Sequence, residues 1–269
     1  MKEKNAYILG TDKEELNRLE IQHKVWASEA RKGWGIAEFK PGQTLLDLGC
    51  GPGFCTVELA HIVGDTGKVI GVDRSESFID YLNQIKLKKQ LSIEPKLADF
   101  SSLSLKPSSI DGVYCRWALA WTPNPKEILS SIKTTLKPGG RMVIQEYFYW
   151  ASHQTQPQKP GLKKAIAAAL KSFKESDSEI DVGRHLSQWF EELGMKTINR
   201  RLMPKLATPD SLTWQWPKTF YKSYFPRLAE MEYLTKENVK EALNDIEVLE
   251  ELSYSTLCCP LMIEVIAEK

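Results

Sequence analysis

The chain has 269 residues, enough for one α/β domain with insertions and a large buried core. Its 36 basic and 35 acidic residues leave a net charge of +1, from which we expect no nucleic-acid partner. No run approaches the ~18 apolar residues of a membrane span, and the five cysteines form no C-x-x-C pair or even framework. We therefore expect a cytoplasmic protein with reduced thiols and no metal site.

An N-terminal helix is predicted from Asp12 to about Trp34, where apolar residues recur at helical spacing. It forms the first part of an expected helical cover over residues 1–40. Two interpretations stay open. Tyr7, Gln22 and Trp26 line a pocket, or the helix is an ordinary amphipathic helix packed on the core.

A strand, a glycine turn and a helix follow in the stretch T-L-L-D-L-G-C-G-P-G at 44–53. Glycines at 49, 51 and 53 permit positive φ and a close approach of backbone to a ligand. The third glycine comes one position earlier than in the dinucleotide pattern G-x-G-x-x-G. Asp47 would repel a pyrophosphate but suits a ligand with an ammonium group. S-adenosylmethionine has such a group and no phosphate.

Three further strands are predicted to end at this same edge, each followed by a polar or aromatic residue. They span 68–72, 94–98 and 110–115, with helices at 54–63, 75–91 and 125–136 between and after them. Asp73 lies 20 positions after Gly53, which is typical of an acidic residue that accepts hydrogen bonds from ribose hydroxyls.

Four segments in this order resemble class I S-adenosylmethionine-dependent methyltransferases, and in particular the small-molecule enzymes of ubiquinone and menaquinone biosynthesis. They are L-L-D-L-G-C-G-P-G at 45–53, G-K-V-I-G-V-D-R-S at 67–75, L-A-D-F at 97–100 and L-K-P-G-G-R-M-V-I at 136–144. The resemblance implies a Rossmann-like α/β fold with a seven-stranded, mostly parallel sheet. Its expected order is 3-2-1-4-5-7-6, with the last strand antiparallel and helices on both faces.

The expected domain organisation is a single methyltransferase domain over 1–269. A cofactor-binding half at 41–150 follows the N-terminal cover, and a substrate-side half at 151–269 carries a helical insertion at about 205–255. No internal repeat or second cofactor motif divides the chain.

The resemblance also implies a set of residues that bind S-adenosylmethionine: Asp47, Gly49, Cys50, Gly51, Gly53, Asp73, Arg74, Asp99, Phe100 and Arg116. Alternatives remain for three of them. Asp73 contacts ribose or caps the next helix, and Asp99 meets adenine or caps a turn. Arg116 pairs with the methionine carboxylate, or the backbone there contacts the ammonium while the side chain forms a salt bridge elsewhere.

The second half of the chain is predicted from composition and spacing. The fifth strand at 141–147 places Glu146, Tyr147 and Tyr149 as acceptor contacts or as an ordinary aromatic strand end. A loop at 151–161 is expected to open and close over the site. Helices follow at 162–174 and 181–193, and strands at 196–203 and 260–267. The aromatic stretch at 211–233 is a substrate lid, a dimer contact or core packing.

The expected function is methyl transfer to a small molecule, with a preference for an aromatic or apolar acceptor, by a monomer or homodimer. His153 is a weak candidate for a general base, and its alternative is a surface loop histidine. Two other functions stay open. One is a sensor or partner subunit that binds S-adenosylmethionine without transferring a methyl group, and the other is an NAD(P)-dependent oxidoreductase.

Overall fold

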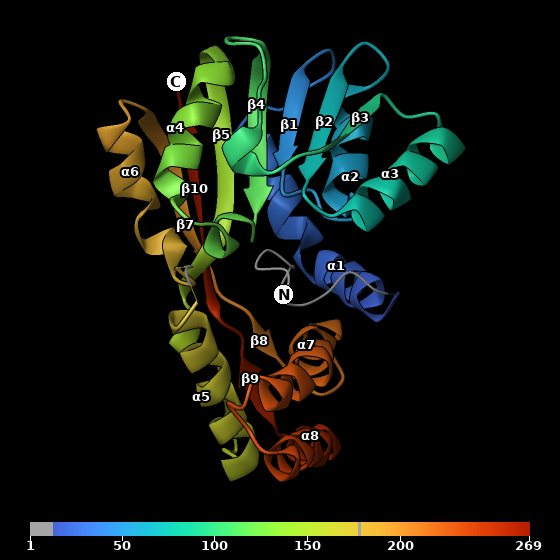
Figure 1. Cartoon of the computed structure of the whole chain (residues 1–269), viewed down its shortest axis with the longest axis vertical. Coiled ribbons are helices and arrows are strands. Elements are labelled where there is room, and N and C mark those ends of the chain that lie inside the picture. Colours follow the sequence, from blue (N-terminus) through green and yellow to red (C-terminus); the bar gives the residue numbers. More distant parts are fainter. Residues whose placement is uncertain (1–12, 177–178) are drawn as a thin grey trace.

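The computed structural model describes residues 13–176 and 179–269. Its centre is a seven-stranded sheet in the order β3-β2-β1-β4-β5-β10-β7 (Figure 1). The strands are β1 (Thr44–Leu48), β2 (Lys68–Asp73), β3 (Ile93–Leu97), β4 (Ile110–Arg116), β5 (Leu136–Tyr149), β7 (Lys196–Met203) and β10 (Leu261–Glu268). Strands β1 to β5 are parallel, and β10 is antiparallel to both of its neighbours. Counted within this sheet alone, β7 is the sixth strand and β10 the seventh, so the expected order 3-2-1-4-5-7-6 and the expected fold class are confirmed.

Helices cover both faces of this sheet, and alternation along the strands decides which side chains each helix meets. Leu45 packs in a cluster with residues of α1 (Lys13–Ile36), α2 (Phe54–Val63) and α3 (Glu76–Lys89). Leu46 belongs to the other cluster, with residues of α4 (Pro125–Thr135) and α6 (Leu186–Glu192). Asp47 shares the Leu45 face, which explains how a carboxylate is buried under α2.

A second, smaller layer lies beyond the carboxyl ends of the central strands (Figure 1). It contains α5 (Pro160–Lys174), α7 (Leu212–Glu230) and α8 (Lys236–Glu251). A three-stranded sheet in the order β6-β9-β8 joins it to the main sheet, with β6 (Gln154–Gln156), β9 (Thr256–Cys258) and β8 (Leu206–Ala207). The prediction of a free loop at 151–161 is therefore wrong. Its strand partner lies about a hundred residues later, beyond the reach of a local pattern.

Two element boundaries also differ from the sequence prediction. Strand β5 begins at Leu136 instead of 141, and its pairing with β4 shifts register between Ile110 and Gly112. The helix predicted at 181–193 is the shorter α6, preceded by a 3₁₀ turn at Val182–Arg184.

The aromatic stretch of α7 forms mainly core. Trp214, Tyr221, Tyr224 and Phe225 are fully buried. The Tyr224 ring stacks on Phe173 of α5, and the Tyr221 ring stacks on Phe225. Within the described residues, no helix is long and apolar enough to cross a bilayer, and no cluster of side chains could hold a metal ion.

Candidate cofactor and acceptor site

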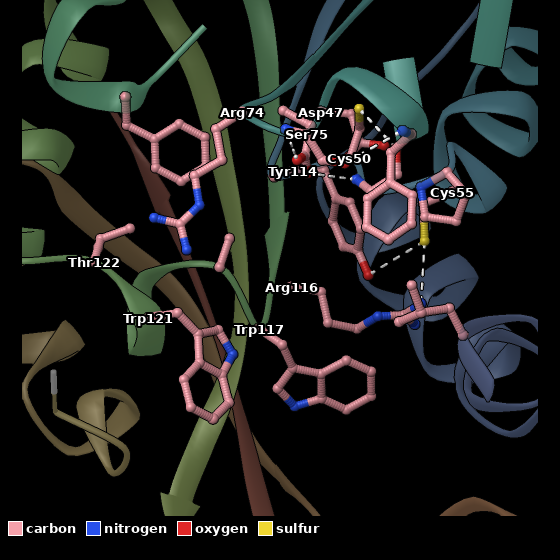
Figure 2. Close-up of a pocket in the computed structure, with 18 of the residues that line it drawn as sticks. Asp47, Cys50, Cys55, Arg74, Ser75, Tyr114, Arg116, Trp117, Trp121 and Thr122 are labelled. Carbon is pink, nitrogen blue, oxygen red and sulfur yellow. Dashed lines mark hydrogen bonds between the residues drawn. The ribbon is translucent and has the colours of Figure 1, made fainter. Parts of the chain in front are cut away.

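A large cavity of about 370 Å³ lies at the carboxyl ends of β1, β2 and β4. This is the edge at which open α/β sheets bind ligands. Figure 2 shows its lining, with Asp47, Tyr114, Arg116 and Trp117 contributed by β1, β4 and the residue after β4. The residues predicted from sequence that line it are Asp47, Gly49, Cys50, Gly51, Asp73, Arg74, Asp99, Phe100 and Arg116.

The three glycines of the turn have different physical roles. All three have positive φ. A Cβ on Gly49 would lie 2.3 Å from the Cβ of Ala118, and one on Gly53 would lie 2.3 Å from Leu82 Cδ1. A Cβ on Gly51 would meet nothing within 4 Å. Gly51 thus leaves cavity space free, whereas Gly49 and Gly53 are required by packing. Gly53 does not line the cavity.

The Asp73 carboxylate is held in place by the backbone. Its Oδ2 accepts a hydrogen bond from the Gly51 N–H at 2.8 Å, and its Oδ1 accepts one from the Ser75 N–H at 2.9 Å. Burial raises the pKa of Asp73, and these two hydrogen bonds oppose the shift. The N-cap of α3 is Ser75, whose hydroxyl accepts from the Phe78 N–H, so the capping alternative for Asp73 is wrong.

Asp47 is 2% exposed at the base of the cavity. The Thr56 hydroxyl donates to its Oδ2 at 2.6 Å. Burial raises the pKa of Asp47 to about 6, although the Thr56 hydrogen bond and the charge of Arg116 favour the ionised form. The group is therefore an anion at neutral pH and becomes neutral in mild acid.

Arg116 brings a positive charge into the same cavity. One guanidinium nitrogen donates to Cys55 Sγ at 3.3 Å (Figure 2), and the other donates to the Trp26 carbonyl at 3.4 Å. The guanidinium also lies 4.9 Å from the centre of the Trp117 ring. No carboxylate in residues 13–176 or 179–269 forms a salt bridge with Arg116. The alternative in which its side chain forms a salt bridge elsewhere is not observed in this part of the chain.

Asp99 and Phe100 form the outer rim of the cavity. Asp99 is exposed and accepts hydrogen bonds from the backbone N–H and the hydroxyl of Ser101, at 2.9 and 2.5 Å. It thereby caps the 3₁₀ turn Phe100–Ser102, and the same hydrogen bonds lower its pKa. The turn-capping role is observed, and Asp99 also lines the cavity.

Several lining residues were not predicted from sequence. Tyr114 is buried within β4 and donates its hydroxyl hydrogen bond to Gln145 at 2.9 Å. His23 lines the cavity from α1 and contacts Cys55 of α2, with 3.6 Å between Nδ1 and Sγ. Gln22, which the sequence left as a possible lining residue, also lines the cavity. Trp26 does not line it and is fully buried between Trp117 and Trp216. Tyr7 lies outside the described residues.

A second cavity adjoins the large one and shares Gln22, Trp117 and Trp121 with it. We call it the aromatic chamber. Its lining consists mainly of rings from β5, α5, α7 and the segments that follow β4 and β5. The lining residues are Arg18, Gln22, Trp117, Trp121, Tyr147, Trp150, His153, Phe173, Trp216, Pro217, Phe220 and Pro260. Trp216 and Phe220 bring part of the aromatic stretch at 211–233 into this lining.

Trp117 forms the partition between the two cavities. Its φ of 53° is left-handed, a conformation that costs a residue with a Cβ on the order of 1–2 kcal/mol. Its ring stacks on Trp216, with centroids 5.6 Å apart, and its Nε1 donates to Met262 Sδ. Such local strain is characteristic of functional sites.

His153 lies in the wall of the aromatic chamber and is 5% exposed, so the interpretation as a surface loop histidine is wrong. The residue belongs to the strand-bearing segment that was predicted as a loop. Burial lowers the pKa of His153 to about 3. The imidazole is therefore neutral at neutral pH and a poor proton acceptor.

Two of the three aromatic or acidic residues at the end of β5 do not reach either cavity. Glu146 is fully buried, and its Oε1 accepts the backbone N–H groups of Ala118 and Leu119 at 2.9 and 2.8 Å. Burial raises its pKa to about 8. Glu146 thus fixes the backbone after Trp117. Tyr149 is 49% exposed and lines neither cavity, while Tyr147 lines the aromatic chamber.

The fold and the cavity together define a class of protein. A seven-stranded sheet with one antiparallel strand, and a carboxylate-lined cavity at a glycine turn, are features of the class I fold that binds adenosyl cofactors. A putative methyltransferase from Bacillus halodurans shares this fold with a TM-score of 0.63 and 16% identity, covering 90% of this chain and 99% of that one. A putative sarcosine dimethylglycine methyltransferase from Galdieria sulphuraria does so with a TM-score of 0.58 and 16% identity, covering 92% and 85%.

Sequence comparison identifies the family. A family model described as a methyltransferase domain matches residues 39–210. A demethylmenaquinone methyltransferase from Lactococcus lactis is 31% identical over 194 residues, which are 66% of this chain and 74% of the relative. The chain belongs to the class I S-adenosylmethionine-dependent methyltransferases, and its cofactor is S-adenosylmethionine.

Proposed function

We propose that this protein transfers the methyl group of S-adenosylmethionine to a small-molecule acceptor whose reacting part is aromatic or apolar. The observation that carries this proposal is the junction of two cavities at Trp117 and Trp121. The large cavity is lined by carboxylates, a guanidinium and glycine backbone without side chains. The aromatic chamber is lined mainly by aromatic rings.

The residues of the large cavity fit the cofactor. The Cβ direction of Gly51 points into open space, and Asp47 and Arg116 supply opposite charges that form no salt bridge with each other in the described structure. We assign Asp47 to the ammonium, Arg116 to the carboxylate and Asp73 to the ribose hydroxyls. Asp99 and Phe100 are assigned to adenine. Gly49, Cys50, Gly51 and Arg74 complete the lining, and Gly53 positions α2.

When bound, the cofactor supplies a methyl group on a sulfonium, already activated for attack by a nucleophile. The protein's task is then to align the acceptor and to exclude water. Trp117 and Trp121, which line both cavities, present apolar surface at the point where cofactor and acceptor would meet. Because His153 is neutral and poorly basic, we do not assign it the role of general base.

Binding and transfer are tested separately. Calorimetry with S-adenosylmethionine, its demethylated product and NAD shows which cofactor the large cavity accepts. Incubation with labelled S-adenosylmethionine and a metabolite extract then reveals transfer through the appearance of demethylated product and a labelled compound. The name of the Lactococcus lactis relative supports trying demethylmenaquinone among the first acceptors. Binding without turnover would favour a sensor or partner subunit, and NAD binding would favour an oxidoreductase.

The substitution Asp73→Ala tests the ribose assignment. We expect the affinity for S-adenosylmethionine to fall by on the order of 1–3 kcal/mol, the worth of hydrogen bonds to a charged group. Asp80→Ala is a matched control, because Asp80 is exposed on α3 and lines neither cavity. Equal affinity of the Asp73 variant and the native protein, measured by calorimetry, would remove Asp73 from the ribose.

A further inference from the structure

His153 is held in one orientation within the wall of the aromatic chamber. Its Nε2 forms a hydrogen bond with the Tyr221 hydroxyl, and its ring stacks on Trp150 with centroids 5.4 Å apart and planes 12° apart. Its backbone N–H donates to the Trp150 carbonyl at 3.1 Å. Tyr221 is fully buried and does not line the chamber. It therefore holds the imidazole from outside the chamber, whose lining includes His153.

The second nitrogen of this imidazole has no partner. His153 Nδ1 is buried and makes no hydrogen bond with any described residue, and no other side-chain atom of the chamber lining shares that state within residues 13–176 and 179–269. A buried polar atom without a partner costs free energy, and such atoms call for an explanation. A phenyl ring would fill the same space without this cost. A ligand that supplies the missing hydrogen bond accounts for the nitrogen.

Two other polar side chains of the chamber already have partners. Arg18 forms a salt bridge with Glu15 at 2.6 Å, and Gln22 Oε1 accepts hydrogen bonds from Arg18 and from Trp216 Nε1. No aspartate or glutamate among the described residues lines the chamber. Aromatic walls alone attract organic cations, but a buried cation also needs a compensating charge. The lining therefore favours an uncharged guest.

We propose that His153 is a specificity-determining residue, whose Nδ1 forms a hydrogen bond with an oxygen substituent of an uncharged ring bound in the aromatic chamber. This rests on the proposed function, because it takes the chamber to be the acceptor site. A neutral imidazole carries one N–H, and the Tyr221 hydroxyl either donates or accepts at Nε2. Nδ1 correspondingly donates to a carbonyl or accepts from a hydroxyl. The chamber's volume of about 40 Å³ gives room for roughly three water molecules, so the chamber itself holds about one small ring of the guest.

Phenol and toluene are suitable probes because they have nearly the same shape and differ in one oxygen. Their affinities are measured by tryptophan fluorescence, with the demethylated cofactor in excess to fill the large cavity. We expect the affinity ratio of phenol to toluene to fall roughly three- to tenfold in His153→Phe, the factor that one net hydrogen bond provides. His185→Phe is the matched control, since His185 stacks on Trp189 outside both cavities. Its ratio should equal that of the native protein.

The native protein provides a test that needs no variant. With ¹⁵N-labelled histidine only four imidazoles contribute signals. Phenol should shift the His153 Nδ1 resonance, and toluene should shift it much less. The inference is overturned by an unchanged resonance with phenol, by an unchanged ratio in folded His153→Phe, or by tetramethylammonium binding more tightly than either ring. Failure of the demethylated cofactor to bind would instead contradict the proposed function, and the resonance test on the protein alone would still decide the role of His153.

Discussion

At the scale of single residues, the three glycines of the turn are required for two different physical reasons, which the sequence does not distinguish. Gly49 and Gly53 lack a Cβ because Ala118 and Leu82 occupy the space. Gly51 faces open volume within the large cavity, and its N–H holds Asp73. Substitution at Gly51 should therefore affect the ligand, whereas substitution at the other two should affect folding.

We predict that Gly51→Val abolishes binding of S-adenosylmethionine while the protein stays folded, because the isopropyl group occupies cavity space. Circular dichroism and calorimetry measure the two properties. Gly139→Val is a matched control, since Gly139 also has positive φ and open space in its Cβ direction but lies outside both cavities. It carries similar backbone strain and should bind normally. Normal binding by the Gly51 variant would exclude the turn as cofactor site.

The ionisation of Asp47 predicts a pH dependence of cofactor affinity. Burial raises its pKa to about 6, so the free protein carries this anion above pH 6 and loses it below. A cationic ammonium prefers the ionised form, and affinity should therefore rise with pH through this range and then level off. Calorimetry between pH 5 and pH 8, in steps of about half a pH unit, measures this change in affinity. Asp47→Asn should flatten the profile, and a variant profile as steep as the native one would assign the titration to another group.

At the scale of elements, a buried polar network fixes α1 against β10 and β7. Arg201 of β7 donates to Glu264 of β10 at 2.7 Å and also pairs with Glu29 of α1. Gln145 of β5 donates to the same Glu264 at 2.6 Å and accepts from Tyr114 in the large cavity. A continuous set of hydrogen bonds thus connects the sheet edge with the cavity.

We predict that Arg201→Met destabilises the protein by about 3–5 kcal/mol, because it leaves the fully buried Glu264 carboxylate without its charged partner. Urea unfolding followed by circular dichroism measures the difference. Arg200→Met on the same strand is the control, since that side chain is exposed. Equal midpoints for the two variants would show that the network contributes little to stability.

At the scale of the whole molecule, α1 and α7 connect the central sheet with the smaller layer. Gln22 of α1 lines both cavities and accepts a hydrogen bond from Trp216 of α7 at 2.9 Å. Trp26 is packed between Trp117 and Trp216 at the same contact. The cavities therefore lie where the two layers meet, and a ligand in the large cavity contacts elements of the central sheet as well as α1.

Cofactor binding should accordingly stabilise the entire fold. At a concentration a hundred times its dissociation constant, S-adenosylmethionine is expected to add about 2.7 kcal/mol. For a protein of this size the melting temperature should rise by roughly 5–10 °C. Differential scanning calorimetry measures the shift, with NAD at the same concentration as the control. A rise with NAD and none with S-adenosylmethionine would contradict the cofactor assignment.

The sequence by itself determined the central sheet and most of the large cavity. Strand, glycine turn and helix succeed one another within about twenty residues, so local periodicity and turn chemistry are sufficient to find them. The family resemblance carried by these segments located Asp47, Asp73, Asp99 and Arg116, and the fold brings them to one edge because the carboxyl ends of parallel strands meet there.

Only the tertiary structure decided the aromatic chamber. Its walls come from α1, the segment after β4, the end of β5, α5 and α7, which are far apart in the chain. Strand β6 likewise finds its partner β9 about a hundred residues away. For this reason the sequence allowed His153 to be a surface loop residue. In the structure it is buried beside the strand pair β6 and β9. A local pattern specifies which face of an element is apolar, but not which distant face will cover it, because that choice depends on the packing of all elements together.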